Sequence, residues 1–301
     1  MSISVIIPTK NRKKQALTAI ESVVNQSYSV NEIIVVDDGS DDKLKLDDMP
    51  EQGGKQITQI LYNDSSKGAN YCRNLGAVKA AGDILMFLDD DDTWEPNKVK
   101  SQLDVFANKP DCGLVYTGKL FVSSGNRNHI LRKVTPKKRG DLKREIFKNN
   151  WIGSTSGVAV RKDIFHESGK FDETLPSFQD YDLYIRICQL TRIEHDRSCH
   201  LRYTVHNTHE NQISGQINRH LESISILRSK YSDLLDSRRK RLFHGFLWYN
   251  IGKAYLKTEP KKSIGPLFKS IFSINRLKAL YLLSIAMAKV IVQPGRKHEG
   301  K

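Results

Sequence analysis

The distribution of apolar residues near the start of the chain predicts two strands with a helix between them. Residues 3–7 and 33–36 are short runs rich in Val and Ile, which is typical of buried strands. Between them Leu17, Ile20 and Val24 recur at helical spacing. Because a helical connection of this length normally joins parallel strands, we expect these two strands to lie side by side and parallel.

The same alternation of strands and helices continues as far as about residue 205. Helical periodicity predicts helices at about 69–81, around 99–106 and at 180–190. Further apolar runs predict strands at 57–62, 84–88, 113–122 and 201–205. We interpret the polar, basic stretch 124–150 as a connection with one short helix. This alternation indicates an α/β fold with a mostly parallel central sheet.

Beyond about residue 215 the pattern becomes wholly helical, with predicted breaks near Pro260, Pro266 and Asn275. A chain of 301 residues is long enough for one large domain with a smaller appendage. We therefore expect an α/β domain over 1–214, divided into the segments 1–122 and 123–214. A helical extension over 215–301 follows it.

The positive charge is concentrated in this extension. Residues 237–301 contain 15 Lys and Arg against two acids, a net charge of +13. Since the whole chain carries +14, residues 1–236 are almost neutral. The basic character therefore belongs to the extension, and the α/β domain has no excess positive charge with which to bind a polyanion.

Cysteine content and the N-terminal sequence favour a cytoplasmic protein. The four cysteines, Cys72, Cys112, Cys188 and Cys199, lie far apart, which argues against a zinc site and against a disulfide framework. The apolar run at 3–7 is too short for a signal peptide.

Four consecutive acids, Asp89 to Asp92, directly follow the predicted strand 84–88. Like charges this close need a cation, and the carboxyl ends of strands are where open α/β sheets bind ligands. Hard oxygen ligands suit Mg²⁺ or Mn²⁺. Taken alone, an exposed acidic turn before the helix that Pro96 begins is an equally good interpretation.

Five segments, taken together and in this order, resemble the family 2 inverting glycosyltransferases. They are SVIIPTKNR at 4–12, VVDDGS at 35–40, KGANYCRNLG at 67–76, FLDDDD at 87–92, and GKFDE at 169–173 leading into QDYDL at 179–183. The resemblance spans roughly residues 2–214. It implies a single Rossmann-like nucleotide-diphospho-sugar transferase domain of the GT-A type, in which segment 1–122 binds the nucleotide and segment 123–214 the acceptor.

The resemblance also implies a donor site with a divalent cation, Mn²⁺ or Mg²⁺, between the protein and the donor diphosphate. Asp89 and Asp91 match the metal and ribose contacts, and the extra acid Asp90 leaves the register open. Asp38 matches the contact to the nucleobase. The other positions assigned to the donor nucleotide are Pro8, Thr9, Asn11, Arg12, Lys67, Gly68, Arg73 and Asp90.

Inverting transfer needs one base that deprotonates the acceptor hydroxyl. The family places this carboxylate second in a Glu-Asp pair, and this chain has Gln179 followed by Asp180. The resemblance therefore implies that Asp180 is the general base. For the donor or acceptor sugar it implies Gln179, Trp151 and Ser154, and for the metal His206 or His209.

Several of these residues also have a simpler interpretation. Asp37 or Asp38 would cap the turn at Gly39, and Arg12 would belong to an ordinary helix start. Arg73 would be a solvated helix arginine, and Trp151 a core residue. We expect Asp92 to cap the segment that follows it.

The basic extension has two interpretations. In the first, amphipathic helices lie on the anionic inner face of the plasma membrane and bring the active site to a lipid-linked acceptor. In the second, the helices pack on the catalytic domain and their lysines are solvated. The run 279–292 is shorter than the roughly 20 residues that a bilayer-spanning helix needs.

The resulting prediction is a metal-dependent inverting glycosyltransferase that uses a nucleotide sugar, by preference a UDP-sugar, to extend a glycan or lipid-linked acceptor of a surface polysaccharide. One alternative is a sugar-nucleotide nucleotidyltransferase, but the loop at 8–12 lacks the glycines that such enzymes place after the first strand. Another is a non-enzymatic protein that binds nucleic acid or membrane. Nucleic acid is not expected as a partner, because the domain that carries the motifs is nearly neutral.

Overall fold

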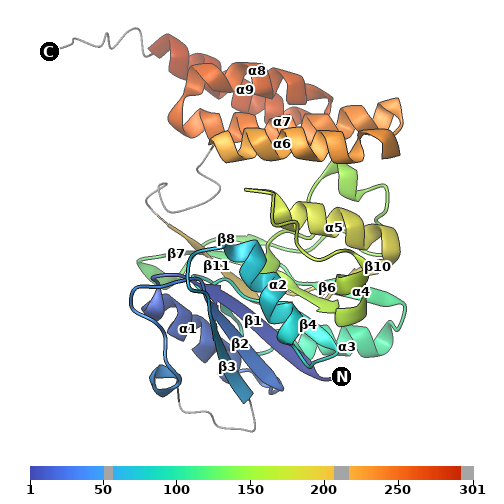
Figure 1. Cartoon of the computed structure of the whole chain (residues 1–301). Helices are drawn as coiled ribbons and strands as arrows, with labels where there is room; N and C mark the ends of the chain where they lie inside the picture. Colours follow the sequence, from blue (N-terminus) through green and yellow to red (C-terminus); the bar gives the residue numbers. More distant parts are fainter. Residues whose placement is uncertain (51–56, 207–216, 293–301) are drawn as a thin grey trace, which may run out of the picture. The chain divides into compact units, whose positions relative to one another are not determined.

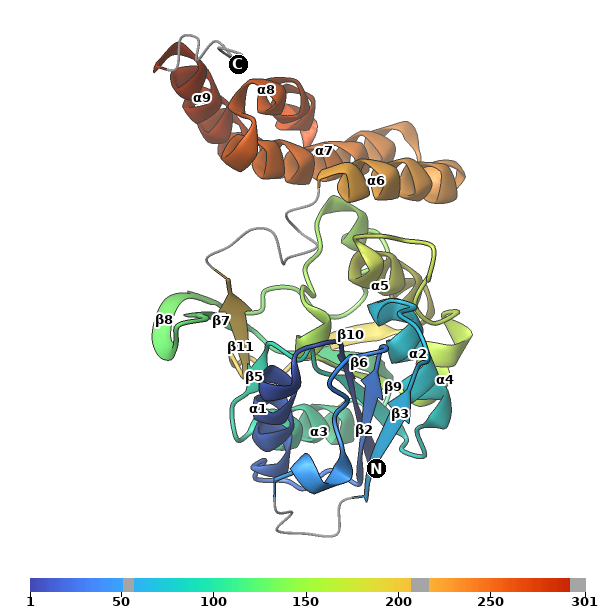
Figure 2. The ribbon, with the colours of Figure 1, turned by 60° about the vertical axis from the view of Figure 1, so that its left-hand side comes forward.

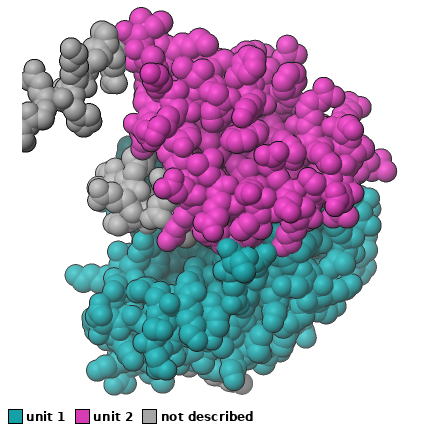
Figure 3. All heavy atoms as spheres, turned by 45° about the horizontal axis from the view of Figure 1, so that its top comes forward, with its two compact units in different colours: residues 1–143, 151–174, 179–207 teal, residues 144–150, 175–178, 208–301 magenta. Residues whose placement is uncertain are grey.

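The computed structural model describes residues 1–50, 57–206 and 217–292 (Figure 1). The chain forms two compact units, which Figure 3 distinguishes by colour. The first, called here the catalytic unit, contains residues 1–143, 151–174 and 179–207. The second, the helical unit, contains residues 144–150, 175–178 and 208–301.

A mostly parallel sheet of seven strands forms the centre of the catalytic unit. Only β9 runs antiparallel to its neighbours β4 and β6. The strands lie in the order β10 (Arg192–His195), β6 (Cys112–Tyr116), β9 (Val158–Arg161), β4 (Ile84–Phe87), β1 (Ile3–Thr9), β2 (Glu32–Asp37) and β3 (Ile57–Tyr62). The predicted α/β class and parallel pairing of β1 with β2 are confirmed.

Helices cover both faces of this sheet (Figure 2). On one face, α1 (Lys13–Val24) and α3 (Lys98–Asn108) share a buried cluster with Val5 and Ile7 of β1. On the other lie α2 (Ala69–Lys79) and α4 (Lys162–Glu167). There the ring of Phe87 in β4 packs 5.4 Å from that of Phe165 in α4. Side chains of β1 and β4 are fully buried because both faces are covered.

A second, four-stranded sheet in the same unit has the order β5 (Thr93–Trp94), β11 (Leu201–Val205), β7 (Lys119–Ser123) and β8 (Asn126–Val134). The prediction of a connection at 124–150 is wrong in its first section, because β8 pairs with β7. Eight of the nine residues of β8 are exposed. A strand without a buried face shows no apolar alternation, so the pattern that identified the other strands is absent here.

The remaining elements of the catalytic unit are short, apart from α5 (Gln179–Leu190). Two 3-10 helices, η1 (Leu46–Asp48) and η3 (Thr155–Gly157), lie in loops. The 3-10 helix η2 (Ile146–Lys148) belongs to the helical unit, where the ring of its Phe147 packs 5.6 Å from that of Phe243. The short helix expected before Asn149 is thus present.

The helical unit is built from α6 (Ile217–Tyr231), η6 (Ser232–Leu234), α7 (Ser237–Thr258), α8 (Pro260–Lys269), η7 (Ser270–Phe272) and α9 (Arg276–Val292). Asp236 caps α7 by accepting a hydrogen bond from the backbone N–H of Arg239. A small core of Leu256, Leu267, Leu283 and Ala286 joins the last three α-helices. No helix within 217–292, or elsewhere in the described chain, is long and apolar enough to cross a bilayer.

The break expected near Pro266 is absent, and α8 continues through this residue to Lys269. A proline inside a helix costs about 3 kcal/mol because it removes a backbone hydrogen bond. Burial of Ser263 and Leu267 on either side of Pro266 offsets this cost. The breaks near Pro260 and Asn275 are present, since α8 begins at Pro260 and α9 begins at Arg276.

Candidate functional site

The candidate site lies at the carboxyl ends of β1 and β4. These strands are parallel neighbours, with Ile6 opposite Phe87. From β1 the chain first continues to β2 and β3 on one side, and then returns to β4 on the other. Such a point, where the strand order reverses, is where open α/β sheets bind ligands. It brings the loop 8–12 next to the acid run 89–92.

Two arginines and a histidine face three of the four acids. Arg73 of α2 pairs with Asp89 through its Nη2 atom. The Nη1 atom of Arg12 lies 3.1 Å from Asp90 Oδ1 and 3.5 Å from Asp91 Oδ2. The Nε2 atom of His206, directly after β11, lies 2.9 Å from Asp91 Oδ2. Residues from three distant segments therefore contact the acids that the sequence concentrates in one place, and the two arginines balance part of their charge.

Burial strongly affects the acids next to these cations. Burial raises the pKa of Asp90 to about 6, although Arg12 beside it acts in the opposite direction. Asp90 Oδ2 accepts a hydrogen bond of 2.9 Å from the Thr9 hydroxyl. For Arg73, burial lowers the pKa, but Asp89 and then Asp180 raise it more. Arg73 is thus a firmly charged group held between the acid run and the start of α5.

Asp92 does not cap the segment after it, so that prediction is wrong. Its Oδ1 atom accepts a hydrogen bond of 2.9 Å from the backbone N–H of Thr204 in β11. The side chain is almost fully buried. Burial, with Asp91 and Asp89 nearby, raises its pKa well above the usual range. Asp92 joins the acid run to the second sheet instead of facing a ligand.

Asp38 uses all of its acceptor capacity inside the protein. Oδ1 accepts hydrogen bonds of 2.8 Å from the Asn63 amide and the Lys67 backbone N–H. Oδ2 accepts from the Ser66 hydroxyl at 2.7 Å and from the Gly68 backbone N–H at 2.9 Å. Burial raises the pKa of Asp38, but these hydrogen bonds lower it to about 2 overall. A nucleobase at this carboxylate would have to share oxygens that the loop 63–68 already occupies.

The loops after β1 and β2 are tied together by polar side chains. Asp37 caps the turn at Gly39 by accepting a hydrogen bond of 2.8 Å from the Ser40 backbone N–H. The Asn11 backbone N–H donates to the Ser40 hydroxyl at 2.8 Å. Asn11 has a φ of +52°, a conformation that asparagine tolerates better than most residues. Pro8 and Thr9 are the last residues of β1, so this locked loop continues directly from the sheet.

Gln179 and Asp180 begin α5, and Asp180 lies close enough to Arg73 and Lys119 to raise the pKa of both groups. Lys119 begins β7, and its Nζ atom lies 5.5 Å from the ring centroid of Tyr203. Burial lowers the pKa of Lys119, in opposition to Asp180 and Asp92. Asp180, the candidate base, and Lys119, a half-buried cation, therefore both lie near the acid run.

The segment 151–156 adjoins the acid run through its last residue. The Ser156 hydroxyl accepts a hydrogen bond of 3.1 Å from the Asp89 backbone N–H. Ser154 precedes η3, and Lys138 Nζ lies 5.5 Å from the ring centroid of Trp151. Trp151 is half-buried rather than a core residue. The other candidate for the metal, His209, lies outside the described residues, whereas His206 contacts Asp91.

The chemistry of these side chains fits a divalent cation that shares its ligands with a substrate. Among the described residues no cluster of three or more His, Cys, Asp or Glu side chains forms a closed metal site. Mg²⁺ and its analogues are usually held by one or two carboxylates together with substrate phosphates. Asp89 and Asp91 would supply such carboxylates, with His206 beside them.

Sequence reasoning missed several residues that shape the site, namely Lys119, Arg127 and Thr204. The Thr204 hydroxyl and the Arg127 guanidinium both donate hydrogen bonds to the Asp91 carbonyl oxygen. These residues come from β7, β8 and β11. None lies in a recognisable motif, so only the pairing of the second sheet could have identified them.

Comparisons with known proteins agree with this geometry. The sequence model of glycosyl transferase family 2 matches residues 4–169. An uncharacterised glycosyltransferase of Haemophilus influenzae is 25% identical over 285 residues, which cover 94% of this chain and 89% of that protein. The putative colanic acid biosynthesis glycosyl transferase WcaA of Escherichia coli is 31% identical over 196 residues, 62% of this chain and 65% of WcaA.

A similar fold occurs in S. aureus TarS 1-349, solved in complex with UDP-GlcNAc. The TM-score is 0.58 at 16% sequence identity, and the alignment covers 98% of this chain and 93% of that one. The similarity to TarS concerns the fold alone. The family match covers residues 4–169, which include the loop 8–12 and the acid run 89–92. The chain therefore belongs to glycosyl transferase family 2, and it is a glycosyltransferase with the GT-A type α/β fold.

Proposed function

We propose that this glycosyltransferase transfers a sugar from a UDP-sugar to a glycan or lipid-linked acceptor, with Mn²⁺ or Mg²⁺ and with inversion at the anomeric carbon. The observation that carries the proposal is the set of carboxylates Asp89, Asp90 and Asp91 at the β1–β4 switch point, which face Arg73, Arg12 and His206. UDP-GlcNAc bound to TarS, which has a similar fold, supports the choice of UDP. The name of WcaA supports polysaccharide biosynthesis.

In this proposal the loop 8–12 and the residues 67–68 hold the nucleotide. Thr9 and Arg12 already touch Asp90, so they border the space beside Asp89 and Asp91. Backbone N–H groups at the start of α1 and α2 suit phosphate oxygens, because a helix N-terminus carries partial positive charge. A bound divalent cation would neutralise the diphosphate as it leaves. Arg73 would contribute a second, permanent positive charge there.

Asp180 serves as the general base. Its position at the start of α5 places a carboxylate near Arg73, and therefore near the expected diphosphate. The base removes the proton of the acceptor hydroxyl while that oxygen attacks the anomeric carbon from the face opposite the nucleotide. A positioned base typically contributes about 10²–10⁴-fold to the rate. Gln179, Trp151 and Ser154 are then the candidates for contacts to the sugars.

The proposed setting is the cytoplasm or the inner face of the plasma membrane. Nucleotide sugars and a lipid-linked acceptor would meet there. The net charge of +13 in residues 237–301 favours an anionic surface as the partner of the helical unit.

Isothermal titration of UDP, GDP and CDP, with and without Mn²⁺, tests the donor site. We expect one nucleotide, UDP, to bind in a metal-dependent manner, and Asp91→Ala to abolish this binding. The matched control is Asp104→Ala, which removes an exposed carboxylate of α3 that pairs with Lys100. Absence of nucleotide binding in the parent protein, or equal binding by both variants, would refute the proposed site.

A further inference from the structure

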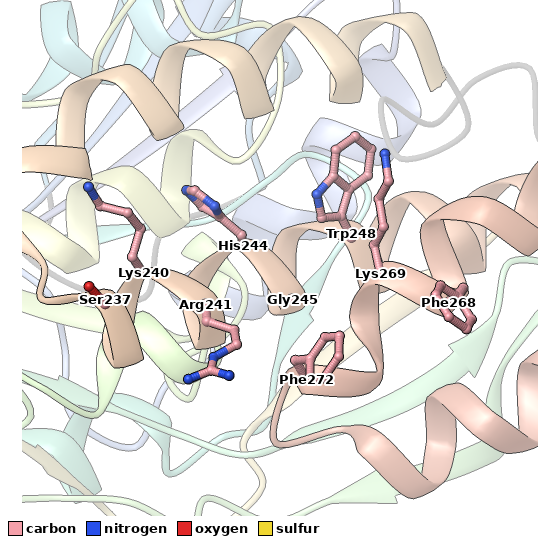
Figure 4. A pocket seen from close by; sticks show the side chains of 9 residues that line it. All are labelled: Ser237, Lys240, Arg241, His244, Gly245, Trp248, Phe268, Lys269 and Phe272. Carbon is pink, nitrogen blue, oxygen red and sulfur yellow. The ribbon is translucent and has the colours of Figure 1, made fainter.

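The helical unit contains a pocket that is separate from the catalytic machinery. Its volume is about 460 Å³. One face of α7 forms most of the wall, and the end of α8 with η7 forms the rest (Figure 4). The lining residues are Ser237, Lys240, Arg241, His244, Gly245, Trp248, Phe268, Lys269 and Phe272.

The polar side of this pocket is suited to an anion. Lys240, Arg241 and Lys269 line it, and none of them forms an ion pair within the described chain. The described residues 237–292 contain a single acid, Glu259, and it pairs with Lys262 instead. The Nε2 atom of His244 is buried and has no hydrogen-bond partner among the described residues. Three basic side chains without an ion pair in the described chain, and an imidazole with an unsatisfied nitrogen, thus belong to residues that line one cavity.

The rest of the pocket is aromatic and unusually exposed. Lys269 Nζ lies 4.6 Å from the ring centroid of Trp248, and Figure 4 shows these two side chains next to each other. Phe268 is 62% exposed and Phe272 is 57% exposed. In α9, Leu277 is 81% and Tyr281 is 66% exposed. Contiguous exposed apolar side chains generally mark an interaction site.

We propose that this pocket binds the phosphate headgroup of an acidic phospholipid and so holds the helical unit on a membrane surface. A phospholipid offers phosphate to the cations, and acyl chains to Phe268, Phe272 and the exposed residues of α9. Free phosphate or a nucleic acid backbone would satisfy the cations alone and would leave these apolar side chains in water. The inference extends the proposed function, which expects a membrane-associated acceptor, but the pocket needs none of the catalytic residues.

Co-sedimentation of the full chain with lipid vesicles tests this site. One set of vesicles contains only phosphatidylcholine. The other also contains phosphatidylglycerol, an acidic phospholipid. The pocket variant is Lys240→Glu/Lys269→Glu. Its matched control, Lys261→Glu/Lys278→Glu, changes the net charge equally at two exposed lysines of α8 and α9 that do not line the pocket.

We expect the parent chain to bind the acidic vesicles and to bind neutral ones weakly. Each cation near an acidic surface strengthens binding by about fivefold. Lys240 and Lys269 also hold the headgroup. We therefore expect the partition coefficient of the pocket variant between vesicles and solution to fall at least about tenfold below that of the control variant. Equal loss in the two variants would mean diffuse charge attraction without a site, and would overturn the proposal. Lack of binding by the parent chain would overturn it as well.

Two further measurements separate the alternatives. Phe268→Ser should weaken binding to the vesicles but leave binding to a DNA duplex unchanged. If the parent chain binds the duplex as tightly as the acidic vesicles, the pocket is a nucleic-acid site and the lipid assignment is refuted. UDP titration of the same variants reports on the donor site independently. Normal UDP binding with lost vesicle binding is the expected result. Absence of UDP binding by the parent chain, together with normal binding of that chain to acidic vesicles, would contradict the proposed function and leave this site intact.

Discussion

Replacement of Asp38 by asparagine tests whether this residue holds the loop that leads into α2. The carboxylate accepts four hydrogen bonds, two at each oxygen. An asparagine offers one acceptor oxygen and one NH₂ group. If the NH₂ group replaces Oδ1, the Asn63 amide and the Lys67 backbone N–H lose their acceptor. If it replaces Oδ2, the Gly68 backbone N–H loses its acceptor, while the Ser66 hydroxyl can rotate and accept from the new NH₂ group.

The expected loss of stability follows from two considerations. The pKa of Asp38 falls from an ordinary 3.8 to about 2, which corresponds to about 1–2 kcal/mol once screening by nearby water is allowed for. The same hydrogen bonds can be viewed from the donor side, where a donor left without an acceptor costs about 1–3 kcal/mol; this is a second measure of one loss and is not added to the first. We therefore expect Asp38→Asn to lower the free energy of unfolding of the catalytic unit by about 1–3 kcal/mol.

Urea unfolding followed by circular dichroism measures this loss, with Asp64→Asn as the control. Asp64 is an exposed neighbour in the same loop, so its replacement changes the charge equally and removes no hydrogen bond of Asp38. The Lys67 and Gly68 amides should also exchange with solvent faster in Asp38→Asn. A loss below about 0.5 kcal/mol would refute the reasoning.

The pH dependence provides a second test. A carboxylate whose pKa is lower in the folded state stabilises the protein above its unfolded pKa, and this contribution disappears as the pH falls through the folded value. The difference between parent and Asp38→Asn should therefore shrink by about 1–2 kcal/mol between pH 5 and pH 2. A difference that does not change over this range would show that the charge of Asp38 is not what stabilises the loop.

Three other predictions concern catalysis, metal binding and the helical unit. Asp180→Asn should lower kcat by about 10²–10⁴-fold in steady-state kinetics. Calorimetry should show a change of less than about threefold in the Kd for UDP, and a large effect on UDP binding would contradict the role of Asp180 as base. His206→Ala should weaken Mn²⁺ binding by about 10–100-fold, and unchanged metal titration would exclude this role. Gly252→Ala should destabilise the helical unit by about 1–3 kcal/mol, because the new Cβ would lie 2.6 Å from Leu267 Cγ. In the paired variant Gly265→Ala the new methyl group meets nothing within 4 Å, so thermal unfolding should show a gain of up to about 1 kcal/mol.

The central sheet could be predicted from the sequence because its strands are buried on both faces. Such strands are continuous runs of Val, Ile and Leu, as at 3–7, 33–36 and 84–88. The exposed strand β8 has no such run, and its pairing with β7 depends on backbone hydrogen bonds that the side chains do not indicate. Similarly, the continuous helix at Pro266 depends on tertiary packing around Leu267, which local sequence rules do not include.

For the candidate site, the sequence located the residue types but not their partners. The acid run, Arg73 and Asp180 stand in motifs, whereas Ser156 and Thr204 reach the acids through contacts across 67 and 112 residues of the chain. The resemblance assigned roles to Asp89 and Asp91, but the sequence did not show what Asp90 and Asp92 contact. The structure distinguishes the acids, since Asp92 is buried against β11 while Asp91 faces His206.

The pairing of the acids explains how the site can be stable before a donor binds. Adjacent carboxylates at the end of one strand repel each other, and here Arg12 and Arg73 supply compensating charge. The same guanidinium groups are suited to phosphate oxygens. We therefore expect donor binding to be an exchange of partners, in which Arg12 and Arg73 turn from the acids to the diphosphate. If Arg12 and Arg73 leave the acids only when both the metal ion and the diphosphate are present, the site should bind the metal ion weakly without nucleotide. The calorimetric titration of each nucleotide with and without Mn²⁺ therefore measures this coupling.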